Sequence, residues 1–175
     1  LGQVYRSVYL LLCGVMMYSV PLTMRRILHT QESLAQESLL HKRSAEQDSL
    51  TGIANRRALE QELAMSMQLA KEVNGRLALF FIDLDGFKEI NDTLGHEAGD
   101  ELLRDIAMDI SKAIRPRDMV ARVGGDEFVI LMDHPVSVED AGHFAVRLQH
   151  TVAREVTTPE GSLPVAASIG VSMYP

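Results

Sequence analysis

An acidic motif directly after an apolar run holds the first residues that could do chemistry. Leu77–Ile82 is uniformly apolar and follows a turn signal, which predicts a buried strand; Asp83 and Asp85 stand at its end, just before Gly86–Lys88. Ligands of α/β sheets bind at such strand ends. A carboxylate beside the free N–H groups of a helix suits a metal–phosphate complex, because the amides cradle phosphate while the carboxylate holds magnesium. The alternative is that Asp83 only caps the helix.

A second motif places two glycines before two acids. Gly-Gly supplies the positive φ angles of a tight turn, so Met119–Val123 and Glu127–Met132 are predicted to form a β-hairpin. Adjacent carboxylates repel each other in a confined site unless a cation or separate roles relieve them. Strand alternation would point the acids to opposite faces, so one could hold a metal while the other acts as a base or further ligand. The alternative is an exposed acidic hairpin tip. The motif comprises Gly124, Gly125, Asp126 and Glu127.

Hydrophobic periodicity predicts the elements that must position these motifs. Apolar residues at helical spacing predict helices, and short apolar runs predict strands. The expected helices are Arg56–Val73, Phe87–Leu94, Asp100–Ile114 and Val138–Val156, and the expected strands are the three named above and Val165–Met173. Helices that alternate with buried strands indicate an α/β sandwich with a central sheet.

Composition excludes some classes of function. The chain has 175 residues and a formal net charge of −7, so it lacks the basic footprint that nucleic-acid binding needs. A small anionic substrate remains compatible, because a bound divalent cation reverses the local field. Cys13 is the single cysteine, which excludes an internal disulfide and a cysteine-based zinc cluster. The globular part is therefore expected in the cytosol.

The N-terminal segment differs in composition from the rest. Val8–Met24 is seventeen residues without a charge, at the short end of what a spanning helix needs, and Arg25 and Arg26 follow as a cytoplasmic flank would. A signal peptide and a buried core helix are the alternatives. Ile27–Gln47 is polar, without Gly or Pro, and predicts a connecting helix that could pair with a second copy or stay solvated as a monomer. The expected parts are 1–26, the end of a transmembrane segment; 27–47, a helical linker; and 48–175, the globular domain.

Four sequence blocks together resemble the GGDEF-domain diguanylate cyclases. They are Asp48–Arg57; Phe81–Lys88 with Asn91-Asp92, Gly95-His96 and Gly99-Asp100; Arg122–Phe128; and Ser168–Val171. The resemblance runs from Asp48 to the last residue, and the blocks stand in the family's order and spacing. It implies a nucleotidyl-cyclase-like α/β (α+β) sandwich, with a central, mainly antiparallel sheet flanked by helices and preceded by an N-terminal helix.

The resemblance also implies a role for each motif residue. Asp83, Asp126 and the backbone carbonyl of Leu84 would ligate Mg²⁺ (or Mn²⁺), and Glu127 would sit by the ribose 3′-hydroxyl or assist the metals. The terminal phosphates would be held by the amides of Gly86, Phe87 and Lys88. The guanine edge would bind to Asn91 and Asp100, and His96 would line the same pocket. Room for the α-phosphate would be left by Gly124 and Gly125. From the residues alone, Asp100 could be a helix cap and Asn91 a turn residue. Asp48 and Arg56 resemble residues with a structural or linker-coupling role.

The activity implied is the condensation of two GTP molecules into cyclic di-GMP with release of pyrophosphate, by a homodimer, in bacterial second-messenger signalling. Localisation at the inner membrane, with a cytoplasmic catalytic domain, follows from the expected transmembrane segment in 1–26.

An inhibitory site for cyclic di-GMP would be formed by Arg115, Asp118 and, from the next helix, Arg147. The alternative is that these residues are solvated charges. Two further alternatives are a non-catalytic cyclic di-GMP receptor and a nucleotidyl cyclase that uses another base. The resemblance also implies a phosphate-gripping Lys and Arg beyond Pro175, so weak or no turnover is expected from these residues alone.

Overall fold

The computed structural model describes residues 45–133, 137–159 and 161–175. The proposed transmembrane part and nearly all of the proposed linker lie outside the described residues. Those parts of the chain therefore stay predictions. Within the described ranges, no helix combines the length and the apolar character that crossing a membrane requires.

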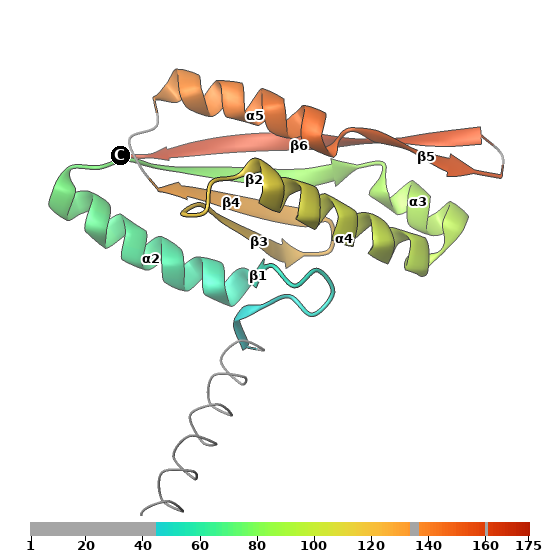
Figure 1. Cartoon of the computed structure of the whole chain (residues 1–175), viewed down its shortest axis with the longest axis horizontal. Helices are drawn as coiled ribbons and strands as arrows, with labels where there is room; N and C mark the ends of the chain where they lie inside the picture. The colour runs from blue at the N-terminus through green and yellow to red at the C-terminus, as the bar shows by residue number, and fades with distance from the viewer. Residues whose placement is uncertain (1–44, 134–136, 160) are drawn as a thin grey trace, which may run out of the picture. The chain divides into compact units, whose positions relative to one another are not determined.

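A six-stranded sheet forms the centre of the domain, in the order β1-β3-β4-β2-β6-β5 (Figure 1). Neighbouring strands run antiparallel, apart from the parallel pair β1–β3. The mainly antiparallel central sheet expected from the sequence is therefore confirmed. The strands are β1 (Ala54–Asn55), β2 (Leu77–Asp85), β3 (Met119–Gly124), β4 (Glu127–Asp133), β5 (Arg154–Thr158) and β6 (Gly161–Tyr174).

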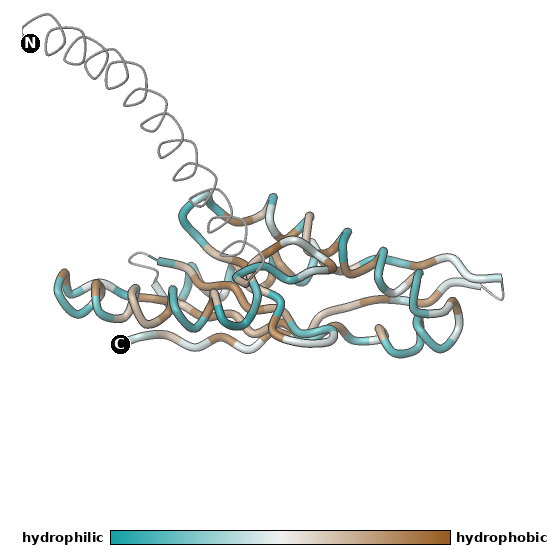
Figure 2. Tube along the Cα trace, turned by 90° about the horizontal axis from the view of Figure 1, so that it is seen from below, coloured by the Kyte–Doolittle hydropathy of each residue, from teal (hydrophilic) through white to brown (hydrophobic). Residues whose placement is uncertain are grey.

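Helices cover both faces of this sheet. The described helices of the domain core are α2 (Arg56–Val73), α3 (Phe87–Leu94), α4 (His96–Ala113) and α5 (Val138–Val152). One apolar cluster joins α4 and α5 to one face of the sheet, and a second joins α2 to the opposite face. Figure 2 shows the apolar stretches concentrated along the sheet, with hydrophilic stretches on the outer sides of the helices. This arrangement is the three-layer sandwich that the alternation of helices and strands predicted.

Strand β2 connects both apolar clusters to the acidic motif. Its side chains alternate between the two faces, so Phe80 and Ile82 pack under α4 and α5, while Leu79 faces α2. The same alternation carries Asp83 and Asp85 onto the α2 side of the sheet, where both are exposed. The strand thus buries one face and presents the two carboxylates on the other.

The boundary between α5 and β5 corrects the sequence expectation of one long helix, Val138–Val156. The helix ends at Val152, and Arg154–Thr158 pairs with β6 as an antiparallel strand. The Arg154 guanidinium donates to the carbonyls of Val152 and Thr151 at 3.1 and 3.3 Å. It thereby satisfies carbonyls that a helix end leaves free. The β-branched residues that follow then pair with β6, a partner that local periodicity could not reveal.

Two other boundaries also differ from the expectation. Helix α4 begins at His96, with Gly95 as its N-cap, so Asp100 lies inside the helix and the interpretation of Asp100 as a cap is wrong. Strand β6 is longer than the expected Val165–Met173 at both ends. The other expected helices and strands are confirmed to within a few residues.

Candidate active site

Asp83 and Glu127 face each other across two neighbouring strands. They are direct register partners in the antiparallel pair β2–β4, so their side chains share one face of the sheet. Like charges placed directly opposite destabilise a sheet unless a cation relieves them. Asp83, Asp126 and Glu127 form no side-chain hydrogen bond or ion pair with another described residue. The carboxylates predicted to work together are thus close in the fold and have no cationic partner among the described residues.

The acidic hairpin turns one residue later than the two glycines predicted. Gly124 closes β3 opposite Glu127, and Gly125 and Asp126 are the central residues of the turn. Gly125 has a φ of 47°, whereas Asp126 has no positive φ, a combination typical of a type II′ turn. Strand alternation therefore does not apply to Asp126, which lies in the turn. The pairing also shifts between Arg122 and Gly124, which makes Val123 a bulge residue at the start of the tip.

The α3 N-terminus lies directly after the β2 carboxylates. Its N-cap is Gly86, with a φ of 86° and no side-chain cap, so the interpretation of Asp83 as a helix cap is wrong. A Cβ on Gly86 would lie 2.6 Å from the carbonyl oxygen of Pro164, so position 86 needs glycine for space as well as for conformation. The amide groups of Phe87 and Lys88 therefore begin a helix that no side chain caps, the setting in which anions bind.

Asp85 has a partner that sequence reasoning missed. The Ser168 hydroxyl, on β6, donates to the Asp85 carboxylate at 3.0 and 3.2 Å to its two oxygens. This bond ties the end of β2 to β6 just before Gly86. Ser168 stood in a recognised block, but nothing in the sequence indicated which carboxylate it would meet.

Asn91 and Asp100 come from the facing helices α3 and α4. An ideal Cβ on Gly99 would lie 2.0 Å from Asn91 Oδ1, so the Asn91 side chain occupies the space that Gly99 leaves open. Both Asn91 and Asp100 are half-buried, whereas His96, at the start of α4, is exposed. Asn91 belongs to α3, so its interpretation as a turn residue is wrong. An amide and a carboxylate from neighbouring helices can bind the donor and acceptor groups at the edge of a base.

A polar network ties the beginning of the domain to the acidic hairpin. Arg122 Nη1 donates to Asp48 Oδ1 at 3.1 Å, and Arg122 Nε donates to the carbonyl oxygen of Gly125 at 2.8 Å. Burial raises the pKa of Asp48, but the hydrogen bonds from Thr51 and Arg122 and the Arg122 charge outweigh it and leave the pKa below its usual value. Asp48 and Arg56 thus have the structural contacts expected of them, since Arg56 Nε donates to the carbonyl of Val123 at 3.2 Å.

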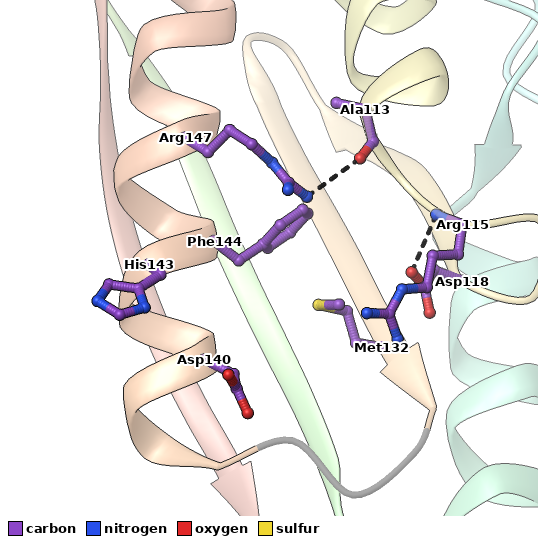
Figure 3. Close-up of a pocket in the computed structure, with 8 residues that line it drawn as sticks. All are labelled: Ala113, Arg115, Asp118, Met132, Asp140, His143, Phe144 and Arg147. Carbon is purple, nitrogen blue, oxygen red and sulfur yellow. Dashed lines mark hydrogen bonds between the residues drawn. The ribbon is translucent and has the colours of Figure 1, made fainter.

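The residues of the predicted inhibitory site line one cavity of about 310 Å³ (Figure 3). Arg115 comes from the loop before β3, where its N–H donates to Asp118 Oδ2 at 3.1 Å. Arg147 comes from α5, where its guanidinium lies 4.8 Å from the centre of the Phe144 ring and donates to the Ala113 carbonyl at 3.4 Å. The structure therefore brings Arg115, Asp118 and Arg147 together around one opening.

Two further polar residues of that cavity were missed. His143 and Asp140 line it from the first turns of α5. Asp140 also belongs to the capping box of that helix, and hydrogen bonds from Ser137 lower its pKa. The spacing of Asp140, His143 and Arg147 along one helix could have indicated a shared polar face.

Among the described residues, no group of three or more His, Cys, Asp and Glu side chains is arranged to hold a metal ion. Magnesium commonly takes only one or two carboxylates from a protein and completes its octahedron with waters and substrate phosphates. The carboxylate of Asp83, with Glu127 opposite it and Asp126 in the adjoining turn, and the Leu84 carbonyl at the end of β2 therefore fit such an ion. The fit rests on the facing positions of Asp83 and Glu127 and on the uncapped start of α3.

Comparison with known proteins gives consistent similarities. Residues 45–175 match the family described as diguanylate cyclase, GGDEF domain. Diguanylate cyclase TpbB from Pseudomonas aeruginosa is 42% identical over 139 residues, which are 79% of this chain and 32% of that protein. The chain thus spans about a third of the length of that relative.

Solved structures show the same likeness. The GGDEF domain of TpbB from Pseudomonas aeruginosa has a TM-score of 0.67 and 42% identity, over 74% of this chain and 76% of that one. A structure with the coiled coil and GGDEF domain of DgcB from Caulobacter crescentus, in complex with c-di-GMP, has a TM-score of 0.81 and 25% identity, over 90% and 84%.

Proposed function

The chain belongs to the GGDEF domain family of diguanylate cyclases, and we propose that it condenses two molecules of GTP into cyclic di-GMP and two pyrophosphates. The observation that carries the proposal is the register of β2 and β4. It sets Asp83 opposite Glu127 and places Asp126 in the adjoining turn, beside the uncapped start of α3. Acidic groups for a metal and free amides for phosphate thus lie at one end of the sheet.

Each part of GTP has candidate contacts in this arrangement. The amides of Phe87 and Lys88 at the α3 N-terminus suit the terminal phosphates. Asn91 and Asp100 suit the acceptor and donor groups of guanine, and a cyclase for another base is the alternative. Gly125 has no heavy atom within 4 Å of where a Cβ would stand, which leaves open space at the hairpin for the α-phosphate.

Asp83, Asp126 and the Leu84 carbonyl are the proposed ligands of Mg²⁺ or Mn²⁺. When bound, a divalent cation neutralises phosphate charge and favours the ionised attacking oxygen. Glu127 is the proposed acceptor of the proton of the ribose 3′-hydroxyl, or a group that assists at the metal. Without a cation, the negative charges of Asp83, Asp126 and Glu127 at this end of the sheet would repel a triphosphate.

Two subunits are required by the stoichiometry of the proposed reaction. The 3′-oxygen of each GTP attacks the α-phosphorus of the other, and each attack releases one pyrophosphate. One active site binds one GTP, so the chemistry needs two domains face to face. We therefore propose a homodimer, in which 27–47 sets the relative position of the two domains.

The test is magnesium-dependent formation of cyclic di-GMP by the full-length protein, with ATP offered in parallel. We expect product from GTP and none from ATP, and a loss of at least about 100-fold in kcat for Asp126→Ala. Asp105→Ala, which removes an exposed carboxylate on α4, is the matched control and should keep wild-type turnover. Equal product from Asp126→Ala would show that the assigned metal site is wrong.

The cavity around Arg115 is proposed as the inhibitory site for cyclic di-GMP. Its arginines offer planar donors to phosphate or guanine, and Asp118 can accept from a guanine edge. We expect Arg115→Ala to weaken cyclic di-GMP binding by at least about tenfold in calorimetry. Arg117→Ala is the matched control, because Arg117 belongs to the same loop but does not line this cavity. Tight binding without any turnover by the full-length protein would instead favour a receptor.

Localisation at the inner membrane, with the catalytic domain in the cytoplasm, is proposed from Val8–Met24 and the two arginines after it. Fractionation of cells that express the full-length protein tests it. Recovery of the protein in the membrane pellet after a high-salt wash supports the proposal, and recovery in the soluble fraction contradicts it.

A further inference from the structure

The cavity between the loop before β3 and helix α5 has one acid and one arginine from each side. Figure 3 shows Arg115 and Asp118 on the loop side, and Asp140 and Arg147 on α5 across the opening. The inhibitory site proposed above uses both arginines and Asp118. It leaves Asp140, the second carboxylate of the same cavity, without a role.

Both carboxylates are fixed in the same way by their own backbone. Asp118 Oδ2 accepts from the Arg115 N–H at 3.1 Å, three residues earlier. Asp140 Oδ2 accepts from the Ser137 N–H at 3.3 Å and from the Ser137 hydroxyl at 2.6 Å, again three residues earlier. Oδ1 of each carboxylate forms no hydrogen bond with another described residue. Each aspartate therefore has one anchored oxygen and one oxygen that is available as an acceptor.

Asp140 lines the cavity as an ionised group. Hydrogen bonds from Ser137 hold the pKa of its carboxyl below the usual value, and the charges of His143 and Arg115 act in the same direction. The Asp140 carboxylate and the Arg115 guanidinium nevertheless form no ion pair with each other or with another described residue. Both charged groups are therefore available to a ligand that enters between them.

A carboxylate in this cavity disfavours phosphate and favours a group with N–H donors. Guanine has two such donors side by side, the ring N1–H and the 2-amino group, and a carboxylate oxygen accepts from both. Adenine has a lone pair at ring position 1, which a carboxylate repels. The arginines suit the acceptor groups of guanine or a phosphate, so an acid beside them supplies the contact that they cannot make.

We propose that Asp140 is a guanine-recognising residue of this cavity, which accepts from the base at Oδ1 and makes the cavity select guanine over adenine in a cyclic dinucleotide. The inference rests on the proposed inhibitory site for cyclic di-GMP and adds a specificity-determining residue to it. One side chain then has two functions, because Oδ2 caps α5 through Ser137 while Oδ1 binds the ligand.

The test is calorimetric titration of the full-length protein with cyclic di-GMP and with cyclic di-AMP. Asp140→Asn keeps one oxygen for the Ser137 bonds and presents an amide N–H₂ to the ligand, where donor meets donor. We expect the affinity for cyclic di-GMP to fall about tenfold, and the preference over cyclic di-AMP to shrink by the same factor. Charge alone predicts the opposite sign, because the loss of a negative charge beside two arginines strengthens the binding of an anion.

Two control variants separate recognition from charge and from helix capping. Glu139→Gln removes the same charge from the neighbouring residue, which is exposed and does not line the cavity, and should not weaken binding of cyclic di-GMP. Ser137→Ala removes the cap but keeps the Asp140 carboxylate. At a temperature where the variant is folded, its affinity should change by less than about threefold. A purely capping role of Asp140 predicts instead that Ser137→Ala and Asp140→Asn weaken binding equally.

The outcomes distinguish this inference from the proposed inhibitory site. Unchanged or tighter binding of cyclic di-GMP by Asp140→Asn, with binding still weakened in Arg115→Ala, would leave the inhibitory site in place and remove Asp140 from it. Equal losses in Asp140→Asn and Ser137→Ala would also overturn the role of Asp140. Absence of cyclic di-GMP binding by the wild type would contradict the inhibitory site itself and, with it, this inference.

Discussion

At the scale of single residues, Gly99 shows how a missing side chain shapes the proposed base-binding site. The amide of Asn91 fills the space that a Cβ on Gly99 would take, and the ring of Phe87 lies 3.3 Å from the same point. Both neighbours are side chains of α3, so a Cβ on Gly99 would force the Asn91 side chain out of its present position. Glycine at this position therefore shapes the proposed base-binding site, although it has no side chain of its own.

Gly99→Ala is expected to displace Asn91 and to weaken magnesium-dependent GTP binding by about tenfold, because the base loses one hydrogen-bonding partner. Calorimetric titration with GTP and with ATP measures the effect and any loss of base selectivity. Gly142→Ala in α5 is the control, because nothing lies within 4 Å of its Cβ position; it should leave binding unchanged and stabilise the helix by about 1 kcal/mol. Unaltered GTP affinity in Gly99→Ala would remove Asn91 from the base-binding site.

The low pKa of Asp48 makes the stability of the domain sensitive to acid. Because its pKa is lower in the folded chain than in the unfolded chain, the carboxylate contributes stability above the unfolded value of about 3.8. That contribution disappears as the pH falls through the lower, folded pKa. We expect the urea midpoint of the wild type to fall more steeply below pH 4 than that of Asp48→Asn. Asp105→Asn, with one fewer exposed carboxyl group, should keep the steep wild-type profile.

At the scale of elements, the α5 N-terminus is fixed by a local capping box. The Asp140 N–H donates to Ser137 Oγ at 3.0 Å, and the Ser137 N–H donates to Asp140 Oδ2 at 3.3 Å. This box begins the helix that contributes Asp140, His143 and Arg147 to the proposed inhibitory cavity. The end of the helix has no such local signal, and it depends on the contacts of Arg154 instead.

Ser137→Ala should lower the free energy of unfolding by about 1 kcal/mol, because the first turn of α5 loses its cap. Urea unfolding followed by circular dichroism measures the change. Ser111→Ala is a suitable comparison: its hydroxyl bonds to the Ala107 carbonyl within α4, so its loss should be nearly neutral. Equal costs in the two variants would mean that the capping box contributes nothing specific.

At the scale of the whole molecule, two adjacent phenylalanines of β2 lie on opposite faces of the sheet and differ in burial. Phe80 is fully buried and meets Phe144 of α5 edge to face, with ring centres 5.0 Å apart. Phe81 points to the α2 side, where it is 51% exposed at the edge of an apolar groove lined also by Leu63 and Val129. Identical side chains in consecutive positions therefore have very different surroundings.

Phe80→Ala should cost about 3–5 kcal/mol of unfolding free energy, because it empties a closely packed site. Phe81→Ala should cost less than about 1.5 kcal/mol in the 175-residue chain, since half of that side chain already meets water. Chemical denaturation of both variants measures the difference. Similar costs would mean that the assignment of the two faces is wrong.

Local patterns in the sequence were sufficient to predict most helices and strands and to locate the acidic motifs. An apolar run predicts β2, helical spacing predicts α2 and α4, and a strand end followed by glycine predicts the start of α3, the proposed phosphate-binding site. These signals work because each depends on neighbours in the chain. The roles of Asp83, Asp126 and Asn91 follow instead from the resemblance to the GGDEF domain family.

Tertiary structure alone decided which of these groups meet. The register of β2 against β4 sets Asp83 opposite Glu127, the bulge at Val123 moves the turn to Gly125 and Asp126, and β6 turns Arg154–Thr158 into a strand. The link from Asp48 through Arg122 to Gly125 likewise joins residues far apart in the chain. Periodicity gives the type of an element and the face of a residue, because both depend on local backbone geometry. Register and long-range partners depend on how separate elements pack, which no local pattern contains.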